Sequence, residues 1–262
     1  MPRTLGHLLT RRGEQGEALP PVLRRLDDMR ARFRRGQVSL IAGRSGGGKS
    51  ALAMHIACRL PDTPTIYWSA DTDLNTLAVR AVASLRHQKI DDAETSIELD
   101  REEIADFLDE ELSHIWWADE PGPSLEDIDL EVEAFAHVYG IYPHLIVIDN
   151  LMDIYGDSPE EATSFKNTMA FSNELSRRTN AHVMVLCHVK GKYESGDHRG
   201  PIGLDGPLQN VVKKPRLILT IYQPQAGLMG ISVVKNTTGP ADPTGKMLIQ
   251  VGWVPGRMWV GE

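Results

Sequence analysis

A glycine-rich run near the start of the chain has the residue types and spacing of a phosphate-binding loop. It fits the pattern G-x-x-x-x-G-K-[ST] at every fixed position, with the residues Gly43, Arg44, Ser45, Gly46, Gly47, Gly48, Lys49 and Ser50. Glycines let backbone N–H groups surround phosphate oxygens, and the helix that follows presents the positive end of its dipole. We expect Lys49 to contact the β- and γ-phosphates and Ser50 to ligate Mg²⁺. The motif therefore predicts a site for a nucleotide, in the form of ATP with Mg²⁺.

The same glycines also fit G-x-S-x-G, the turn that exposes the nucleophilic serine of many hydrolases. That alternative leaves Lys49 and Ser50 unexplained, and no convincing order of aspartate then histidine near strand ends supports it. Nucleotide binding is therefore the favoured hypothesis.

Three more side chains with useful chemistry follow apolar, strand-like runs. Asp149 ends the run 145–148, where a parallel strand would deliver a carboxylate to hold Mg²⁺ directly or through water. Asp71 follows the run 65–69 and is the candidate base that orients or deprotonates the attacking water. Asp73 is a rival for that role, although either aspartate could instead cap the next helix. His188 would emerge at the same sheet edge, where a neutral imidazole could sense the γ-phosphate.

The elements that must position these residues alternate between strands and helices. Strands are predicted at 38–42, 65–69, 115–118, 145–148 and 183–186, and helical patterns follow the first four, at 52–60, 74–85, 125–139 and 162–175. Beyond residue 186 a loop rich in glycine and charge precedes strand patterns at 217–222, 229–235 and 247–253. The fold class is therefore α/β: a mostly parallel central sheet with helices on both faces and a C-terminal β-meander.

Composition limits the setting of the protein. The chain has 262 residues, of which 41% are hydrophobic, and two cysteines. This is enough for one sizeable core, and neither a signal peptide nor an apolar stretch of membrane-spanning length is visible. We expect an intracellular, cytoplasmic protein with no membrane partner, in the host cytoplasm if a phage encodes it.

Charge is segregated along the chain, whose formal net charge is −8. Residues 91–112 carry eleven acidic residues and a single arginine, so the rest of the chain is slightly basic. An acidic outer face can therefore coexist with a basic channel. In the glycine-rich loop, Lys190, Lys192 and Arg199 have the spacing of a flexible segment that lines a nucleic-acid backbone. An ordinary solvated loop would explain them almost as well.

Two regions are expected along the chain. Residues 1–36 hold nine arginines against four acidic residues and are interpreted as a basic arm or linker. Residues 37–262 are expected to form the ATPase domain.

Several segments together resemble the RecA-like motor domain of DnaB-family replicative helicases, especially short phage versions, over roughly residues 22–255. Besides the phosphate-binding loop, the matching segments are Leu26-Asp27, Arg35-Gly36-Gln37, Ser69-Ala70-Asp71, Ile148-Asp149, Cys187-His188 and 234–240, which includes Gly239-Pro240. The resemblance implies a RecA-like P-loop NTPase core. It also implies a homo-oligomeric ring, usually hexameric, with ATP bound between subunits and single-stranded DNA held by central loops.

The resemblance also implies that Lys235 contacts the ATP of a neighbouring subunit. The chain departs from the family at Asp71, where the family has glutamate, and at Thr237, where the family has an arginine two residues after its lysine. A trans arginine raises the rate by about 10³ or more in related NTPases. Whether Lys213, Lys214 or Arg216 compensates depends on how subunits pack. The family's helical N-terminal domain is not matched, and we expect only the short arm in its place.

The leading functional hypothesis is an ATP-hydrolysing DNA helicase or translocase that acts on single-stranded or branched DNA in replication or recombination. One alternative is a metal-dependent, structure-specific DNA nuclease on the same fold, in which Asp71, Asp73, Asp149 and Asp153 hold two metals. Another is a slow ATP-binding recombination mediator.

Overall fold

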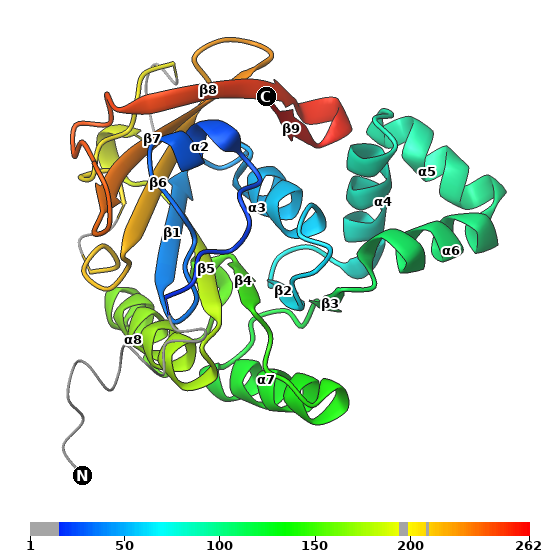
Figure 1. The fold of residues 1–262 in the computed structure, drawn as a ribbon, viewed down its shortest axis with the longest axis horizontal. Coiled ribbons are helices and arrows are strands. Elements are labelled where there is room, and N and C mark those ends of the chain that lie inside the picture. The colour runs from blue at the N-terminus through cyan, green and yellow to red at the C-terminus, as the bar shows by residue number, and fades with distance from the viewer. Residues whose placement is uncertain (1–15, 194–198, 208–209) are drawn as a thin grey trace.

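A single nine-stranded sheet organises the chain in the computed structural model, which describes residues 16–193, 199–207 and 210–262 (Figure 1). The strands lie in the order β3-β2-β4-β5-β1-β6-β7-β8-β9. Their bounds are β1 Val38–Gly43, β2 Thr65–Ser69, β3 Ile115–Ala118, β4 Leu145–Asp149, β5 His182–His188, β6 Leu217–Tyr222, β7 Leu228–Asn236, β8 Leu248–Val254 and β9 Trp259–Gly261. In this spatial order, neighbouring strands from β3 through β1 to β6 pair in parallel, and those from β6 to β9 pair antiparallel. The pairing confirms the predicted parallel sheet and β-meander.

Helices cover both faces of the sheet, as predicted. The helices are α2 Arg24–Asp28, α3 Lys49–Cys58, α4 Leu74–Leu85, α5 Ile90–Leu99, α6 Arg101–Leu112, α7 Leu125–Tyr139 and α8 Glu161–Thr179, with short 3₁₀ turns at Leu151–Asp153, Gly191–Tyr193 and Pro255–Arg257. Side chains of α3 and α4 pack into one hydrophobic core, and those of α7 and α8 pack into a second core across the sheet. The strands between the two cores are buried on both faces, which is why they read as continuous apolar runs in the sequence.

The acidic stretch 91–112 forms most of α5 and all of α6, which project from the sheet beside α4 (Figure 1). A small third core lies beneath them and contains Val82, Ala83, Ala93 and Ile104. Most acidic side chains of these helices face solvent, because only one stripe of each helix is apolar. The acidic charge is thereby kept on an outer part of the molecule.

The segment 16–36 lies against the main domain. Leu19, Leu23 and Leu26 are buried in the same core as α3, and Arg35 donates a hydrogen bond to the carbonyl of Asn180 at 3.2 Å. Residues 1–15 of the predicted basic arm lie outside the described residues. The boundary at residue 36 stays a prediction.

His182, at the start of β5, is a buried histidine whose two ring nitrogens are both used. Nδ1 lies 2.8 Å from the carbonyl oxygen of Arg34, so it carries the proton, and Nε2 accepts from the Ser39 hydroxyl at 2.8 Å. Burial lowers the pKa of His182 to about 4. The fold therefore requires the neutral imidazole.

We expect this histidine to make folding stability sensitive to acid. The unfolded chain takes up a proton near the ordinary histidine pKa of about 6.5, whereas the folded protein resists it, so stability is lost as pH falls towards about 4. The loss attributable to His182 is about 3 kcal/mol. Urea unfolding across this pH range gives the free energy of unfolding as a function of pH. Its slope should be shallower for His182→Gln than for the wild type, and equal to the wild-type slope for the exposed His137→Gln control. If His182→Gln showed the same pH dependence of unfolding free energy as the wild type, His182 would not be the source of the acid sensitivity.

Candidate functional site

The predicted phosphate-binding loop connects β1 to α3 at the carboxyl edge of the sheet. Gly48 precedes α3 with a backbone φ of 93°, in the left-handed region that favours glycine. A Cβ atom at this position would lie 2.6 Å from Met229 Cε and 3.1 Å from a ring carbon of Trp253. Glycine is therefore required both by the backbone conformation and by the close approach of β7 and β8.

Lys49 begins α3 and is almost fully buried, with 6% of its surface exposed. Its Nζ donates to the carbonyl of Arg44 at 3.0 Å and lies 3.3 Å from His188 Nδ1. Burial lowers the pKa of the ammonium, and the nearby Asp149 carboxylate opposes that effect. A phosphate group beside Lys49 would supply the further negative charge that this buried cation favours.

Asp149 ends β4 and is 3% exposed. The Tyr67 hydroxyl donates to its Oδ2 at 2.9 Å, and the side chain of Ser50 is also hydrogen-bonded to it. Burial is the main reason that the pKa of Asp149 rises to about 6. Ser50 and Asp149, the two predicted Mg²⁺ ligands, thus lie together, and their hydroxyl and carboxylate oxygens are the donor types that Mg²⁺ prefers.

The structure separates Asp71 from its rival Asp73. Asp71 is exposed in the turn after β2, near enough to Asp149 for its negative charge to help raise the pKa of that carboxyl group. Asp73 is the N-cap of α4 and accepts from the backbone N–H and the hydroxyl of Thr76 at 3.0 and 2.7 Å. Asp73 is therefore occupied as a helix cap, and Asp71 is left facing the phosphate-binding loop.

A cavity of about 320 Å³ lies at the junction of these elements. It is lined by residues of the phosphate-binding loop and by Asp71, Thr72, Arg80, Asp149, Asn150, His188, Trp253, Pro255 and Met258. The strand pairings account for this convergence, because Ser69 lies opposite Asp149 and Gly43 lies opposite His188. The carboxyl ends of the parallel strands thus deliver Lys49, Asp71, Asp149 and His188 to one place.

His188 also lines a second cavity, of about 300 Å³, on the other side of the phosphate-binding loop. The lining includes Ser45, Gly46, Tyr222 and Gln223. His188 thus lies between two hollows beside the loop, a position compatible with the predicted sensor role.

Sequence reasoning missed several residues of the site. Tyr67 is an inward-facing strand residue whose hydroxyl reaches Asp149, and Arg80 of α4 donates to the Thr72 hydroxyl at 3.3 Å. Trp253 and Met258 come from the C-terminal meander, about two hundred residues after the loop that they contact. No local pattern marks these residues, because they reach the cavity only through the sheet order.

The predicted DNA loop begins next to the site. Lys190 follows His188 by two residues, pairs with Glu161 at 3.6 Å and lies over the Phe165 ring. Arg199 is exposed, and the side chain of Lys192 lies outside the described part of the structure. The Arg44 guanidinium of the phosphate-binding loop donates to the carbonyl of Tyr193, so the two loops are in direct contact.

Lys235 does not lie at this cavity. Its Nζ donates to the carbonyl of Val212 at 2.7 Å and to that of Lys213 at 3.3 Å, near the end of β7. Lys235 lies beside the start of β6, and β6 pairs in parallel with β1. The phosphate-binding loop follows the other end of β1, so Lys235 and the loop lie at opposite ends of these strands. Lys235 is therefore too far away to contact a nucleotide bound by its own chain.

Three of the four acids proposed for a nuclease lie near one another, because burial and then the negative charge of Asp71 raise the pKa of both Asp149 and Asp153. Within residues 16–193, 199–207 and 210–262, no group of three or more His, Cys, Asp or Glu side chains is placed to hold a metal ion. Asp73 is engaged with Thr76, as described above. The two-metal arrangement stays a prediction of the sequence.

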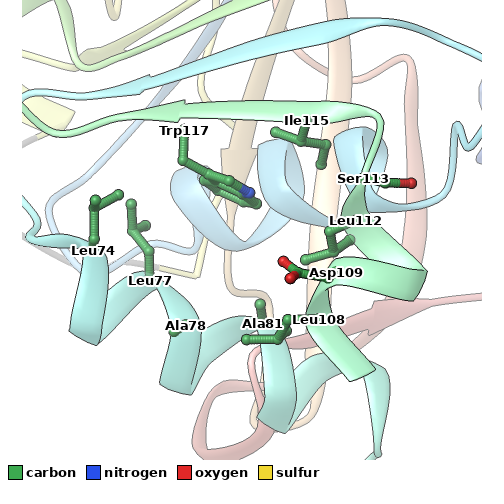
Figure 2. Close-up of a pocket in the computed structure, with 10 residues that line it drawn as sticks. All are labelled: Leu74, Leu77, Ala78, Ala81, Leu108, Asp109, Leu112, Ser113, Ile115 and Trp117. Atoms are coloured by element: carbon green, nitrogen blue, oxygen red, sulfur yellow. The ribbon is translucent and has the colours of Figure 1, made fainter. Parts of the chain in front are cut away.

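A separate apolar cavity of about 400 Å³ lies between α4, α6 and β3 (Figure 2). Its lining residues are Leu74, Leu77, Ala78, Ala81, Leu108, Asp109, Leu112, Ser113, Ile115 and Trp117. This lining contains no basic side chain and no glycine loop, so the cavity is unsuited to phosphate groups.

Comparisons with known proteins identify one family model and two phage relatives. The family model described as AAA domain matches residues 8–192. Gene 65 protein of Mycobacterium phage L5 is 33% identical over 260 residues, covering 96% of this chain and 95% of the relative. Gene 65 protein of Mycobacterium phage D29 is 30% identical over 235 residues, covering 85% of this chain and 98% of the relative.

Solved structures share the fold at low sequence identity. A solved ATPase domain matches with a TM-score of 0.80 at 14% identity, covering 98% of this chain and 95% of that one. A DnaB-like replicative helicase, solved with a view to its interactions with primase, matches with a TM-score of 0.78 at 14% identity. This chain spans 64% of that helicase chain. The predicted RecA-like fold is confirmed, and none of the described helices is long and apolar enough to cross a membrane.

Proposed function

The chain belongs to the AAA domain family and is a P-loop ATPase with the fold of DnaB-like helicase ATPase domains, and from this premise we propose that it is a DNA-dependent helicase or translocase. Its substrate would be single-stranded or branched DNA in replication or recombination. The observation that carries the proposal is the convergence of Lys49, Asp149 and Asp71 on one cavity that a phosphate-binding loop lines.

Several residues of the cavity would act in ATP hydrolysis. The loop N–H groups and Lys49 would hold the phosphates, and Ser50 and Asp149 would hold Mg²⁺, which when bound neutralises charge on the β- and γ-phosphate oxygens. Tyr67 fixes the orientation of the Asp149 carboxylate. Asp71 would accept a hydrogen bond from the attacking water and orient it.

Coupling to DNA would pass through the contact between the two loops. Arg44 binds the carbonyl of Tyr193, and Lys190 lies a few residues before it on the predicted DNA loop. A change in the phosphates bound beside Arg44 would therefore move the predicted DNA loop, which is proposed to hold the DNA backbone. His188 contacts Lys49 and precedes Lys190 by two residues, so it would pass the same change from the phosphates to the predicted DNA loop.

The proposal includes a ring of identical subunits, most simply a hexamer. The distance of Lys235 from its own cavity supports it, because that lysine can serve a nucleotide only if a second copy presents one. A head-to-tail interface of this kind joins two different surfaces and closes into a ring when the rotation allows.

The test is steady-state ATP hydrolysis with and without single-stranded DNA at fixed low salt. Salt must be fixed because phosphate contacts weaken steeply as it rises. We expect single-stranded DNA to raise the rate several-fold, and Lys49→Ala to remove both the basal and the stimulated rates. Negligible turnover with DNA present would contradict the motor function.

A slow ATP-binding recombination mediator is the second candidate. Thr237, in place of an arginine, favours it, because fast hydrolysis at a subunit interface usually needs that guanidinium. Tight ATP binding without strand separation would support this candidate over the helicase.

A further inference from the structure

Arg216 lies immediately before β6, beside the residues with which the parallel strand β1 begins. Its backbone N–H donates to the carbonyl of Val38 at 2.8 Å, and Leu217 is the parallel partner of Ser39. The phosphate-binding loop follows the far end of β1, at Gly43. At about 3.3 Å per strand residue, Arg216 is roughly 15–20 Å from that loop, which is beyond the reach of its side chain.

Arg216 is the cross-strand neighbour of Thr237. In the antiparallel pairing of β6 with β7, Leu217 lies opposite Asn236, and the N–H of Thr237 donates to the carbonyl of Arg216 at 2.9 Å. Side chains of opposed residues leave an antiparallel sheet on the same face, about 5 Å apart at Cβ. Arg216 therefore presents a guanidinium beside the exposed position where the sequence has threonine.

A second cation lies next to Arg216. Lys235 is two residues before Thr237 and so lies on the same face of β7. The positive charge of Arg216, together with burial, lowers the pKa of Lys235. Within the described residues neither side chain forms an ion pair with a carboxylate. Two neighbouring cations without an acidic partner are a surface that favours an anion.

An anion bound at this position would come from another molecule, since the chain's own nucleotide cavity lies at the other end of these strands. Lys190 of the predicted DNA loop also lies at that other end, directly after β5. The pair Arg216 and Lys235 is therefore separate from Lys190. A phosphate group presented by a second copy of the chain fits this position, and a guanidinium binds phosphate oxygens in a two-pronged geometry.

We propose that Arg216 acts in trans on ATP bound by a neighbouring copy, where it takes the place of the arginine that Thr237 does not provide, with Lys235 beside it. This inference rests on the proposed ring-forming ATPase. In the step, the oxygen of water forms a bond to the γ-phosphorus while the bond from that phosphorus to the β-γ bridging oxygen breaks, giving ADP and inorganic phosphate, and the proton that water loses passes to Asp71 and then to solvent. The Arg216 guanidinium stabilises the charge that develops on the phosphate oxygens.

The first measurement compares Arg216→Ala with Lys214→Ala, which removes an exposed cation two residues away. We expect Arg216→Ala to lower kcat for ATP at least about 100-fold with a much smaller change in KM. Lys214→Ala should retain the wild-type rate within about twofold. The double variant Arg216→Ala with Thr237→Arg should recover part of the lost rate, because residue 237 lies beside position 216. A wild-type kcat in Arg216→Ala would overturn the proposal.

The second measurement tests the action in trans. Lys49→Ala and Arg216→Ala chains, each inactive alone, are co-expressed with different affinity tags and mixed oligomers are purified through both tags. About one quarter of the interfaces would then combine an intact loop with an intact Arg216, and we expect about that fraction of the wild-type rate to return. Mixed oligomers no more active than either parent would overturn the proposal.

The controls separate this inference from the proposed function. A wild-type protein without ATP hydrolysis, or one unaffected by Lys49→Ala, would refute the ATPase motor itself. If the wild type and Lys49→Ala behave as expected but Arg216→Ala loses only binding of single-stranded DNA, the motor stands and the trans role is wrong.

Discussion

Asp149→Asn is expected to lower Mg²⁺-dependent ATP hydrolysis at least about 1,000-fold, because it removes the buried charge that would hold the metal at the phosphates. The same substitution should stabilise the nucleotide-free protein. The folded-state pKa of Asp149 is raised to about 6, so the folded protein binds a proton more tightly than the unfolded chain does. Its ionisation therefore reduces stability as pH rises from about 4 through about 6, and the reduction persists above pH 6.

Urea unfolding at pH 8 without nucleotide is the measurement, alongside steady-state hydrolysis. We expect Asp149→Asn to be more stable than the wild type by roughly 3 kcal/mol, and the difference to shrink as pH falls below about 6. Asp127→Asn, in the capping box of α7, is the control, since hydrogen bonds from Ser124 lower the pKa of Asp127 and this residue does not line the cavity. Equal stability of Asp149→Asn and the wild type at pH 8 would show that burial does not destabilise this carboxylate.

Asp71→Asn is expected to lower kcat for ATP hydrolysis by about 10² to 10⁴, the range for loss of a general base. Asparagine keeps the size of the side chain and removes its ability to take up a proton from water. Because Asp71 is exposed at the rim of the cavity rather than buried, we expect folding and nucleotide binding to change little. Stopped-flow binding of a fluorescent ATP analogue, together with steady-state kinetics, separates the two effects.

Asp73→Asn is the matched control for this prediction. Asparagine caps a helix about as well as aspartate, so the hydrogen bonds to Thr76 can persist and stability should be nearly unchanged. We expect its kcat to stay within about threefold of the wild type. If Asp73→Asn were as defective as Asp71→Asn, or more so, the base would have to be reassigned.

The local features of the chain were predictable because short-range rules determine them. The strands 65–69, 115–118 and 217–222 and the helices 74–85 and 125–139 have the bounds that apolar periodicity indicated. Strands buried on both faces read as unbroken apolar runs, and the glycine loop is contiguous in the sequence. The phosphate-binding loop, and the presence of an acid after each of two strands, could therefore be identified without coordinates.

The acidic stretch 91–112 was recognised only as a region of charge. Its two helices bury few side chains, among them Ala93, Ile104 and Leu112, so the apolar signal is sparse. The last strand, Trp259–Gly261, is three residues long and gives no period that could be recognised. Short or weakly buried elements depend on their neighbours more than on their own pattern.

By itself the sequence predicted a phosphate-binding loop at residues 43–50 and carboxylates at the ends of parallel strands. The tertiary structure decided which acid faces the loop, because hydrogen bonds to Thr76 engage Asp73 and leave Asp71 at the cavity. It also brought Tyr67 to Asp149, Trp253 to Gly48 and Arg216 to Thr237. The physical reason is that strand order and register set these contacts, and both depend on how distant segments pack, which no local pattern encodes.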